Sequence, residues 1–137
     1  MLGRTANSLF WMFRYLERAE NTARLLEAAL RMALTRDLAT AEAEWRSVIA
    51  TLGLSKAYEA LHESYDGMQV WNFVLRGPSN PGNVRLMFGA VRSNARTART
   101  NISSDVWEAV NENWMKLDAL LARPVGQAGV GEVLAAI

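Results

Sequence analysis

Residues 7–34 carry apolar side chains three and four positions apart along their whole length, and this spacing restricts the chain to helical folds. The Glu20–Arg24 and Glu27–Arg31 pairs, each with the acid four positions before the base, support a solvated opposite side. A helix of this kind has to bury its apolar stripe against other elements. The stripe consists of Trp11, Met12, Tyr15, Leu16, Ala19, Ala23, Leu26, Leu30 and Ala33.

Four further helices are predicted from the same periodicity together with start and stop signals. The second starts near Asp37 and stops at Gly53, and Ser55 is a suitable N-cap for the third. The sequence RGPSNPGN then interrupts the pattern, and within it Asn80 before Pro81 predicts the N-cap and first residue of the fourth helix. The predicted ranges are 37–52, 55–75, 81–100 and, after a cap at Ser103 or Ser104, up to Leu121.

The sequence shows no strand pattern and no low-complexity tract beside these helices. Long helices with short connections pack as antiparallel neighbours. We therefore predict an all-α fold, an up-and-down helical bundle of about five helices. The bundle is expected to occupy residues 1–122. Residues 123–137, which contain a proline and three glycines, are expected to form a linker and the start of a further helix.

The end of the chain predicts an apolar helix that has no partner. Val133, Leu134 and Ile137 have no later segment to pack against, and burying such residues is worth roughly 1.5–3 kcal/mol each. An exposed apolar end also promotes aggregation. We therefore expect that the chain is a fragment of a longer protein, or that it forms a homo-oligomer in which a second copy covers this surface.

The composition is that of a globular protein and excludes several kinds of site. The chain has 137 residues, a net charge of +1 and no cysteine, so disulfides and thiolate metal sites are excluded. The N-terminal segment lacks the apolar core and the cleavage site of a signal peptide. No apolar run approaches the roughly 18 residues that a membrane span needs. A soluble cytoplasmic protein without a membrane partner is therefore expected.

Four arginines of the predicted fourth helix fall within about 60° of one another on a helical wheel. No acidic residue lies between Gly67 and Ser104, so the stripe needs opposing charges from elsewhere or must stay solvated. The favoured interpretation is solvation, or pairing with first-helix glutamates such as Glu17 and Glu20. The alternative is an anion site for phosphate, a carboxylate tail or an acidic partner. Nucleic-acid binding ranks last, because the overall charge is near neutral. The stripe consists of Arg85, Arg92, Arg96 and Arg99.

A second polar group lies at the edge of the apolar stripe of the first helix. Two arginines, a glutamate and an amide share that side, where a plain helix would place packing residues. One interpretation is a polar network that fixes the register of the bundle, with Glu17 bonded to an arginine of the fourth helix. The other is a pocket for a carboxylate or a phosphate, because the arginine fork pairs bidentately with either anion. That pocket would be formed by Arg14, Glu17, Arg18 and Asn21, facing Arg92 and Arg96.

The sequence gives little support to a metal site or to nucleophilic catalysis. Glu59 and His62 have the E-x-x-H spacing, but di-iron bundles need two such motifs and two further glutamates. The chain has a single histidine, which also leaves little basis for a general-base scheme. We therefore expect no metal, no cofactor and no catalytic residue.

Several separated segments, in the same order, resemble the alpha-E domain family, which is named for its helical content and its Glu-Arg motif. Here that motif is Glu17–Arg18. Phe13 stands where a small residue is expected in the family, which weakens the case for a close helix approach at that point. Family members are considerably longer, with a second helix of Glu-Arg type, so this chain resembles their N-terminal half. The matching segments are RTANSLFWMFRYLERAENTARLL (4–26), NPGNV (80–84), RSNAR (92–96) and ISSDVWEAVN (102–111).

The resemblance implies a helper function and no established reaction. Family members are typically encoded beside, or fused to, a circularly permuted ATP-grasp enzyme and a transglutaminase-like protein. The leading hypothesis is therefore a non-catalytic helical interaction or accessory module of an ATP-grasp-linked system that forms peptide or amide bonds, with one of these proteins as partner. The alternative hypothesis is a catalytic or anion-binding domain that uses Glu17 and an arginine cluster on an aminoacyl or phosphoryl substrate.

Overall fold

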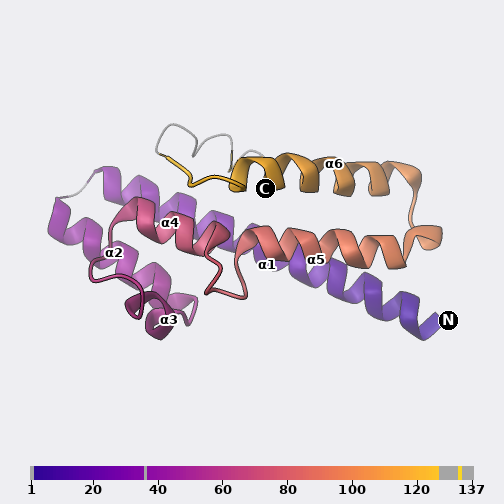
Figure 1. The fold of residues 1–137 in the computed structure, drawn as a ribbon, viewed down its shortest axis with the longest axis horizontal. Coiled ribbons are helices and arrows are strands. Elements are labelled where there is room, and N and C mark those ends of the chain that lie inside the picture. The colour runs from indigo at the N-terminus through magenta and orange to yellow at the C-terminus, as the bar shows by residue number, and fades with distance from the viewer. Residues whose placement is uncertain (1, 36, 127–132, 134–137) are drawn as a thin grey trace.

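The computed structural model describes residues 2–35, 37–126 and 133, and these residues contain helices and no strand. The all-α prediction is therefore confirmed. The helices form a bundle in which α1 runs antiparallel to α2 and to α5, and α5 runs antiparallel to α6 (Figure 1). The described helices are α1 (Leu2–Leu34), α2 (Leu38–Thr51), α3 (Ser55–Glu59), α4 (Gly67–Arg76), α5 (Val84–Thr97) and α6 (Ser104–Leu121), with a short 3-10 helix at Arg99–Asn101.

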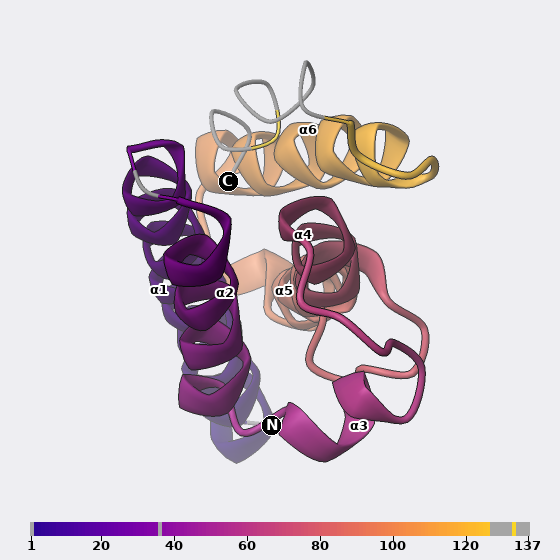
Figure 2. The same ribbon diagram turned by 90° about the vertical axis from the view of Figure 1, so that its left-hand side faces the viewer.

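The first helix spans the molecule and packs on different neighbours along its length. α1 starts at Leu2, earlier than predicted, and its 33 residues make it roughly 50 Å long. α2 folds back along its C-terminal half, and α5 lies along its N-terminal half, where Met12 packs with Val91 and Ala95. α4 and α5 follow one another along one line (Figure 2), and in the loop of residues 77–83 between them Gly82 lies near Arg18, in the middle of α1.

The starts of four helices are set by side chains that accept a hydrogen bond from the backbone N–H three positions further on. The predicted starts at Asp37 and Ser103 are confirmed. Asn80 was expected to cap the fourth helix, but its Oδ1 accepts instead from the N–H of Gly82 at 3.0 Å within the loop. Asn83 caps α5, which therefore begins later than predicted. The four capping residues are Asp37, Asp66, Asn83 and Ser103.

The predicted third helix, residues 55–75, is divided into α3 and α4, so this prediction is wrong. Residues 60–66 leave the helix, and this allows Tyr58 and Tyr65 to stack with ring centroids 4.6 Å apart. The buried hydroxyl of Tyr58 then donates to the carbonyl oxygen of Ser64 at 2.7 Å. A buried hydroxyl is costly without such a partner, and a continuous helix would have kept that carbonyl for its own backbone.

Two clusters of buried side chains form the interior. The larger includes the fully buried Trp71 of α4 and joins it to α1, α2, α5 and α6. It also contains Val125 and Val133, and Val133 is only 2% exposed. The expectation that Val133 has no packing partner within this chain is therefore wrong, because this side chain packs into the larger cluster. Leu134 and Ile137 lie outside the described residues.

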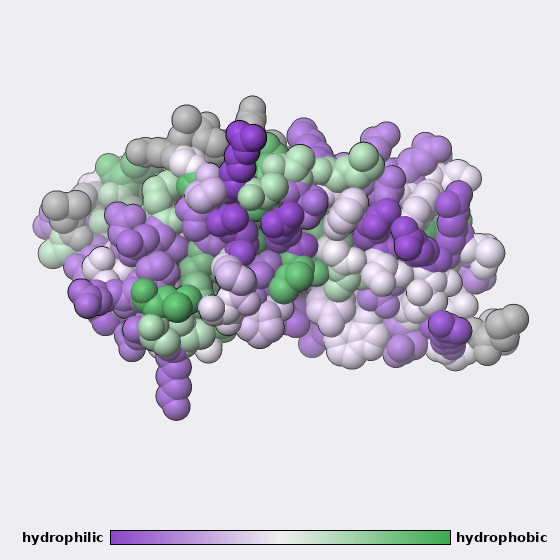
Figure 3. All heavy atoms as spheres, in the orientation of Figure 1, coloured by the Kyte–Doolittle hydropathy of each residue, from purple (hydrophilic) through white to green (hydrophobic). Residues whose placement is uncertain are grey.

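Much of the outer surface is polar. Figure 3 shows hydrophilic side chains over much of the face seen there, with hydrophobic atoms gathered in small separate patches. In the part of the chain that the structure describes, no helix has the length and apolar character that crossing a bilayer requires. Two of the most exposed large apolar side chains, Phe10 and Phe13, lie on the N-terminal half of α1.

Candidate functional site

Three members of the arginine stripe contact α6: Arg85 and Arg92 from α5, and Arg99 from the short 3-10 helix that follows it. Arg85 Nε donates to Asp118 Oδ1 at 2.7 Å, and Arg92 Nε donates to Asn111 Oδ1 at 2.9 Å. The Arg92 guanidinium also lies over the ring of Trp114, 4.1 Å from its centroid, in a cation–π contact. These arginines therefore hold α6 against α5, and the predicted pairing of the stripe with glutamates of the first helix is wrong.

Of the other two arginines of the stripe, Arg99 also contacts α6 and Arg96 does not. The Arg99 guanidinium lies over the Trp107 ring of α6, 5.0 Å from its centroid. Arg96 is exposed and forms no ion pair with any residue that the structure describes. Glu20, one of the expected partners of the stripe, instead bonds Arg24 on its own helix at 2.6 Å. The stripe is thus mainly a contact surface for α6.

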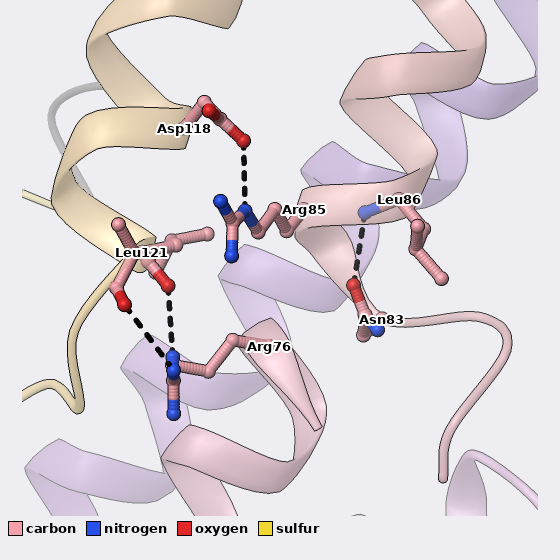
Figure 4. A network of polar contacts seen from close by, with 7 residues as sticks. Arg76, Asn83, Arg85, Leu86, Asp118 and Leu121 are labelled. Atoms are coloured by element: carbon pink, nitrogen blue, oxygen red, sulfur yellow. Dashed lines mark hydrogen bonds and ion pairs between the residues drawn. The ribbon is translucent and has the colours of Figure 1, made fainter. Parts of the chain in front are cut away.

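A further arginine fastens the far end of α6 (Figure 4). Arg76, the last residue of α4, donates through Nε to the carbonyl oxygen of Leu121 at 2.8 Å and through Nη2 to that of Ala122 at 3.5 Å. A cation at this place meets both the free carbonyls and the negative end of the helix dipole. Arg76 and the nearby Arg85–Asp118 pair join α6 to the rest of the bundle (Figure 4).

The polar group of the first helix separates into two sides. Arg14 and Glu17 line one hollow, and Arg18 and Asn21 line another. All four side chains are exposed, and Glu17 has no ion pair with a described residue. No arginine of the α5 stripe lines either hollow. The predicted shared pocket, and the predicted bond from Glu17 to the fourth helix, are therefore absent from the described part of the chain.

The larger hollow has a volume of about 590 Å³, and we name it the Arg18 cleft. Its lining residues come from the middle of α1, the end of α2 and the loop between α4 and α5, among others. This volume is within the range of roughly 300–1,000 Å³ that small-molecule sites occupy. Its lining consists of Arg18, Asn21, Thr22, Leu25, Thr51, Leu52, Leu54, Val74, Asn80, Pro81, Gly82 and Met87.

The loop wall of the Arg18 cleft is held in place by asparagine side chains. Asn80 is 1% exposed, donates to the carbonyl oxygen of Phe73 at 3.4 Å and accepts from the N–H of Gly82 at 3.0 Å. Asn83 donates to the carbonyl oxygen of Asn80 at 3.0 Å. Arg18 Nη2 lies 3.9 Å from the place that a Cβ on Gly82 would occupy, so the guanidinium reaches this wall. The pattern Asn80–Pro81 predicts a helix start, whereas in the structure Asn80 holds this wall.

The second hollow lies on the N-terminal half of α1 and has a volume of about 520 Å³. Phe10 is 58% exposed and Phe13 is 59% exposed, values that are unusual for side chains of this size. Arg14 and Glu17 stand beside these rings. We name this surface the α1 aromatic face, and it consists of Ala6, Leu9, Phe10, Phe13, Arg14 and Glu17.

The E-x-x-H residues take part in aromatic packing around α3. Glu59 Oε1 accepts from the hydroxyl of Tyr65 at 2.8 Å, and the His62 ring lies 4.7 Å from that of Tyr58. Burial, with the nearby charges of Tyr65 and Asp66, raises the pKa of Tyr58 to about 12. Within the described ranges, no three His, Asp or Glu side chains gather as metal ligands would.

One family model matches residues 1–137, and its description reads "A predicted alpha-helical domain with a conserved ER motif". The chain contains one Glu-Arg pair, Glu17–Arg18, which stands at the boundary between the two hollows. No curated protein and no solved structure matches the chain.

Proposed function

We propose that this chain, which belongs to the Alpha-E family, is a non-catalytic helical module that binds a protein partner in an ATP-grasp-linked system for peptide or amide-bond formation. The proposed partner is a circularly permuted ATP-grasp protein, and a transglutaminase-like protein is the other candidate. Because such a system consumes ATP, the proposed assembly belongs in the cytoplasm.

The observation that carries this proposal is the α1 aromatic face. Phe10 and Phe13 project from one helix with more than half of each side chain exposed, and Arg14 and Glu17 stand beside them. Aromatic side chains at the centre with charged groups at the rim are typical of protein interfaces. Covering a Phe side chain is worth roughly 1.5–3 kcal/mol, so a partner that buries both rings gains substantially.

The two charges beside the rings add specificity to this surface. Arg14 and Glu17 have opposite sign and lie one helical turn apart, so they favour a partner that presents the complementary order of charges. Since neither has an ion pair with a described residue, both remain available to a partner. This arrangement supports binding better than it supports the catalytic hypothesis, because neither the Arg18 cleft nor the α1 aromatic face brings Glu17 together with an arginine of the stripe.

The test is binding to the ATP-grasp protein encoded nearest to this chain. The double variant Phe10→Ser with Phe13→Ser is expected to weaken the complex at least tenfold, measured by titration calorimetry of the purified proteins. The matched control is Met115→Ser, which removes an equally exposed apolar side chain from α6, and it is expected to bind like the parent chain. Equal affinity of the double variant and the parent would overturn the proposal, as would failure of the parent chain to bind.

A further inference from the structure

The Arg18 cleft has a polar end that the rest of the bundle leaves unused. Arg18 and Asn21 are one turn apart on α1 and open into the cleft, and neither makes an ion pair or a side-chain hydrogen bond with a described residue. This distinguishes Arg18 from Arg76, Arg85 and Arg92, whose guanidinium groups are bonded to α6. Arg18 is therefore a cation without an assigned partner at the mouth of a cleft.

The position of Arg18 is restricted by the loop opposite. The guanidinium reaches Gly82, where a Cβ would stand 3.9 Å from its Nη2 and 3.6 Å from Asn80 Oδ1. The buried Asn80 is bonded to both α4 and Gly82, so this wall has a fixed geometry. A third hollow, smaller than the cleft and distinct from the α1 aromatic face, has a volume of about 330 Å³. It shares Arg18, Pro81, Gly82 and Met87 with the cleft. An anion at the guanidinium would therefore have an open approach.

The remainder of the lining is largely aliphatic. It comes from α1, from the end of α2, from α4 and from α5, and it includes no carboxylate. A ligand that fits this surface has an apolar body of moderate size next to its charged group. The aliphatic lining consists of Leu25, Leu52, Leu54, Val74 and Met87.

We propose that the Arg18 cleft binds a monocarboxylate carried on an aliphatic body, with the carboxylate on the Arg18 fork and the body against the leucines. One guanidinium neutralises one carboxylate and pairs with it bidentately. A phosphate dianion would keep an unbalanced charge, because Arg18 is the only ionisable residue among those that line the cleft. The free amide of Asn21 supplies a further hydrogen-bond donor.

Two kinds of ligand carry a carboxylate on an aliphatic body. One is a free aliphatic acid, and the other is the C-terminal carboxylate of a peptide or an acylated amino acid that ends in an apolar residue. The proposal does not rest on the α1 aromatic face, which shares no residue with the cleft. Partner binding and carboxylate binding can therefore fail separately.

The experiment titrates the isotope-labelled chain with small probes and follows backbone amide shifts by NMR. Hexanoate is expected to change the chemical shifts of the backbone amides at 80–83 and around Arg18. It is also expected to bind at least tenfold more tightly than hexanamide. Because each buried methylene contributes about a threefold to fourfold gain, butanoate should bind about tenfold more weakly than hexanoate. N-acetyl-leucine is the second probe and represents a peptide or acylated amino acid. The probe that binds with the higher affinity, N-acetyl-leucine or hexanoate, identifies which kind of carboxylate the cleft prefers.

The variants test the role of the guanidinium. Arg18→Gln is expected to weaken hexanoate binding at least tenfold, and Arg18→Lys, which keeps the charge but loses the fork, about threefold. Arg24→Gln is the matched control, since Arg24 lies on the same helix, is 73% exposed and pairs with Glu20 outside the cleft. It should bind like the parent.

Three outcomes would overturn the proposal. The first is the absence of binding for every carboxylate probe, and the second is unchanged hexanoate affinity in Arg18→Gln. The third is binding of hexyl phosphate or hexylamine at least as tightly as hexanoate, because this would contradict the match of one carboxylate to one guanidinium.

Discussion

Glu17 and Arg18 are neighbours in the chain and line two different hollows of the molecule, Glu17 on the α1 aromatic face and Arg18 in the cleft. A residue on a helix is turned by about 100° from the next, so consecutive polar residues can serve two surfaces. The Glu-Arg motif named in the description of the family thus marks the boundary of two surfaces in this chain. It does not form an internal ion pair in the described structure.

Replacing Glu17 should leave the stability of the chain unchanged. Because Glu17 is exposed and has no ion pair with a described residue, Glu17→Ala is expected to alter the free energy of unfolding by less than about 0.5 kcal/mol. Urea denaturation followed by circular dichroism measures this. A loss above about 1.5 kcal/mol would mean that Glu17 is held within the bundle, as the sequence had suggested.

Arg92 and Arg96 provide a matched pair on one helix. Arg92→Ala removes the bond to Asn111 and the contact with Trp114, and it should cost about 1–2 kcal/mol of stability. Arg96→Ala removes an exposed side chain and should cost less than about 0.5 kcal/mol. Thermal unfolding of the two variants compares them directly. Equal losses would show that the α6 contacts of Arg92 contribute nothing.

Tyr58 should make the stability of the chain fall in alkaline solution. Burial raises the pKa of its hydroxyl from 10.0 to about 12 in the folded state, so the unfolded chain loses this proton first as the pH rises. The stabilisation is complete below pH 10.0 and is lost between there and about pH 12, by roughly 1–2 kcal/mol.

Urea midpoints between neutral pH and pH 12, with tyrosinate absorbance recorded in parallel, measure this effect. Tyr58→Phe serves as the control, because it removes the titrating group while keeping the ring. Its stability should decline less over the same interval. An identical decline in both proteins would assign the effect to other groups.

The α1 aromatic face should also promote self-association when no partner is present. The homo-oligomer expected from the sequence stays a prediction, and the exposed rings of Phe10 and Phe13 offer a surface for it. Light scattering over a range of concentrations should show more association for the parent chain than for the Phe10→Ser, Phe13→Ser variant. A parent chain that stays monomeric at all concentrations would contradict this.

Periodicity predicted most of the inward-facing residues of α1 but not which elements they meet, and it wrongly placed Trp11, which is 39% exposed, in the buried stripe. The break at residues 60–66 was missed because Tyr58 and Tyr65 keep helical spacing through it, although Asp66 before Gly67 is a usual helix start. A helical wheel cannot show that two tyrosines seven positions apart will stack on each other across a turn. Tertiary packing decided that point.

The partner of the arginine stripe was predictable in principle. The polar and aromatic residues of α6 repeat at spacings of four, three and four, and they meet Arg85, Arg92 and Arg99 in antiparallel order. Carboxylates are the usual partners of arginine, but most of these partners are aromatic rings and an amide. The Arg18 cleft could not be predicted, because Asn80 and the end of α2 reach α1 only through the path of the folded chain. The α6 residues concerned are Trp107, Asn111, Trp114 and Asp118.

The change of neighbours along α1 has a consequence for how the chain folds as it is synthesised. The C-terminal half of α1 can pair with α2 as soon as α2 leaves the ribosome, because the two are adjacent in sequence. The N-terminal half has to wait for α5, whose Val91 lies about eighty residues after Met12. The N-terminal half of α1 thus stays uncovered for longer than the C-terminal half. Its run of large apolar residues at 9–13 stays open to chaperones, or to the proposed partner, until α5 has been synthesised.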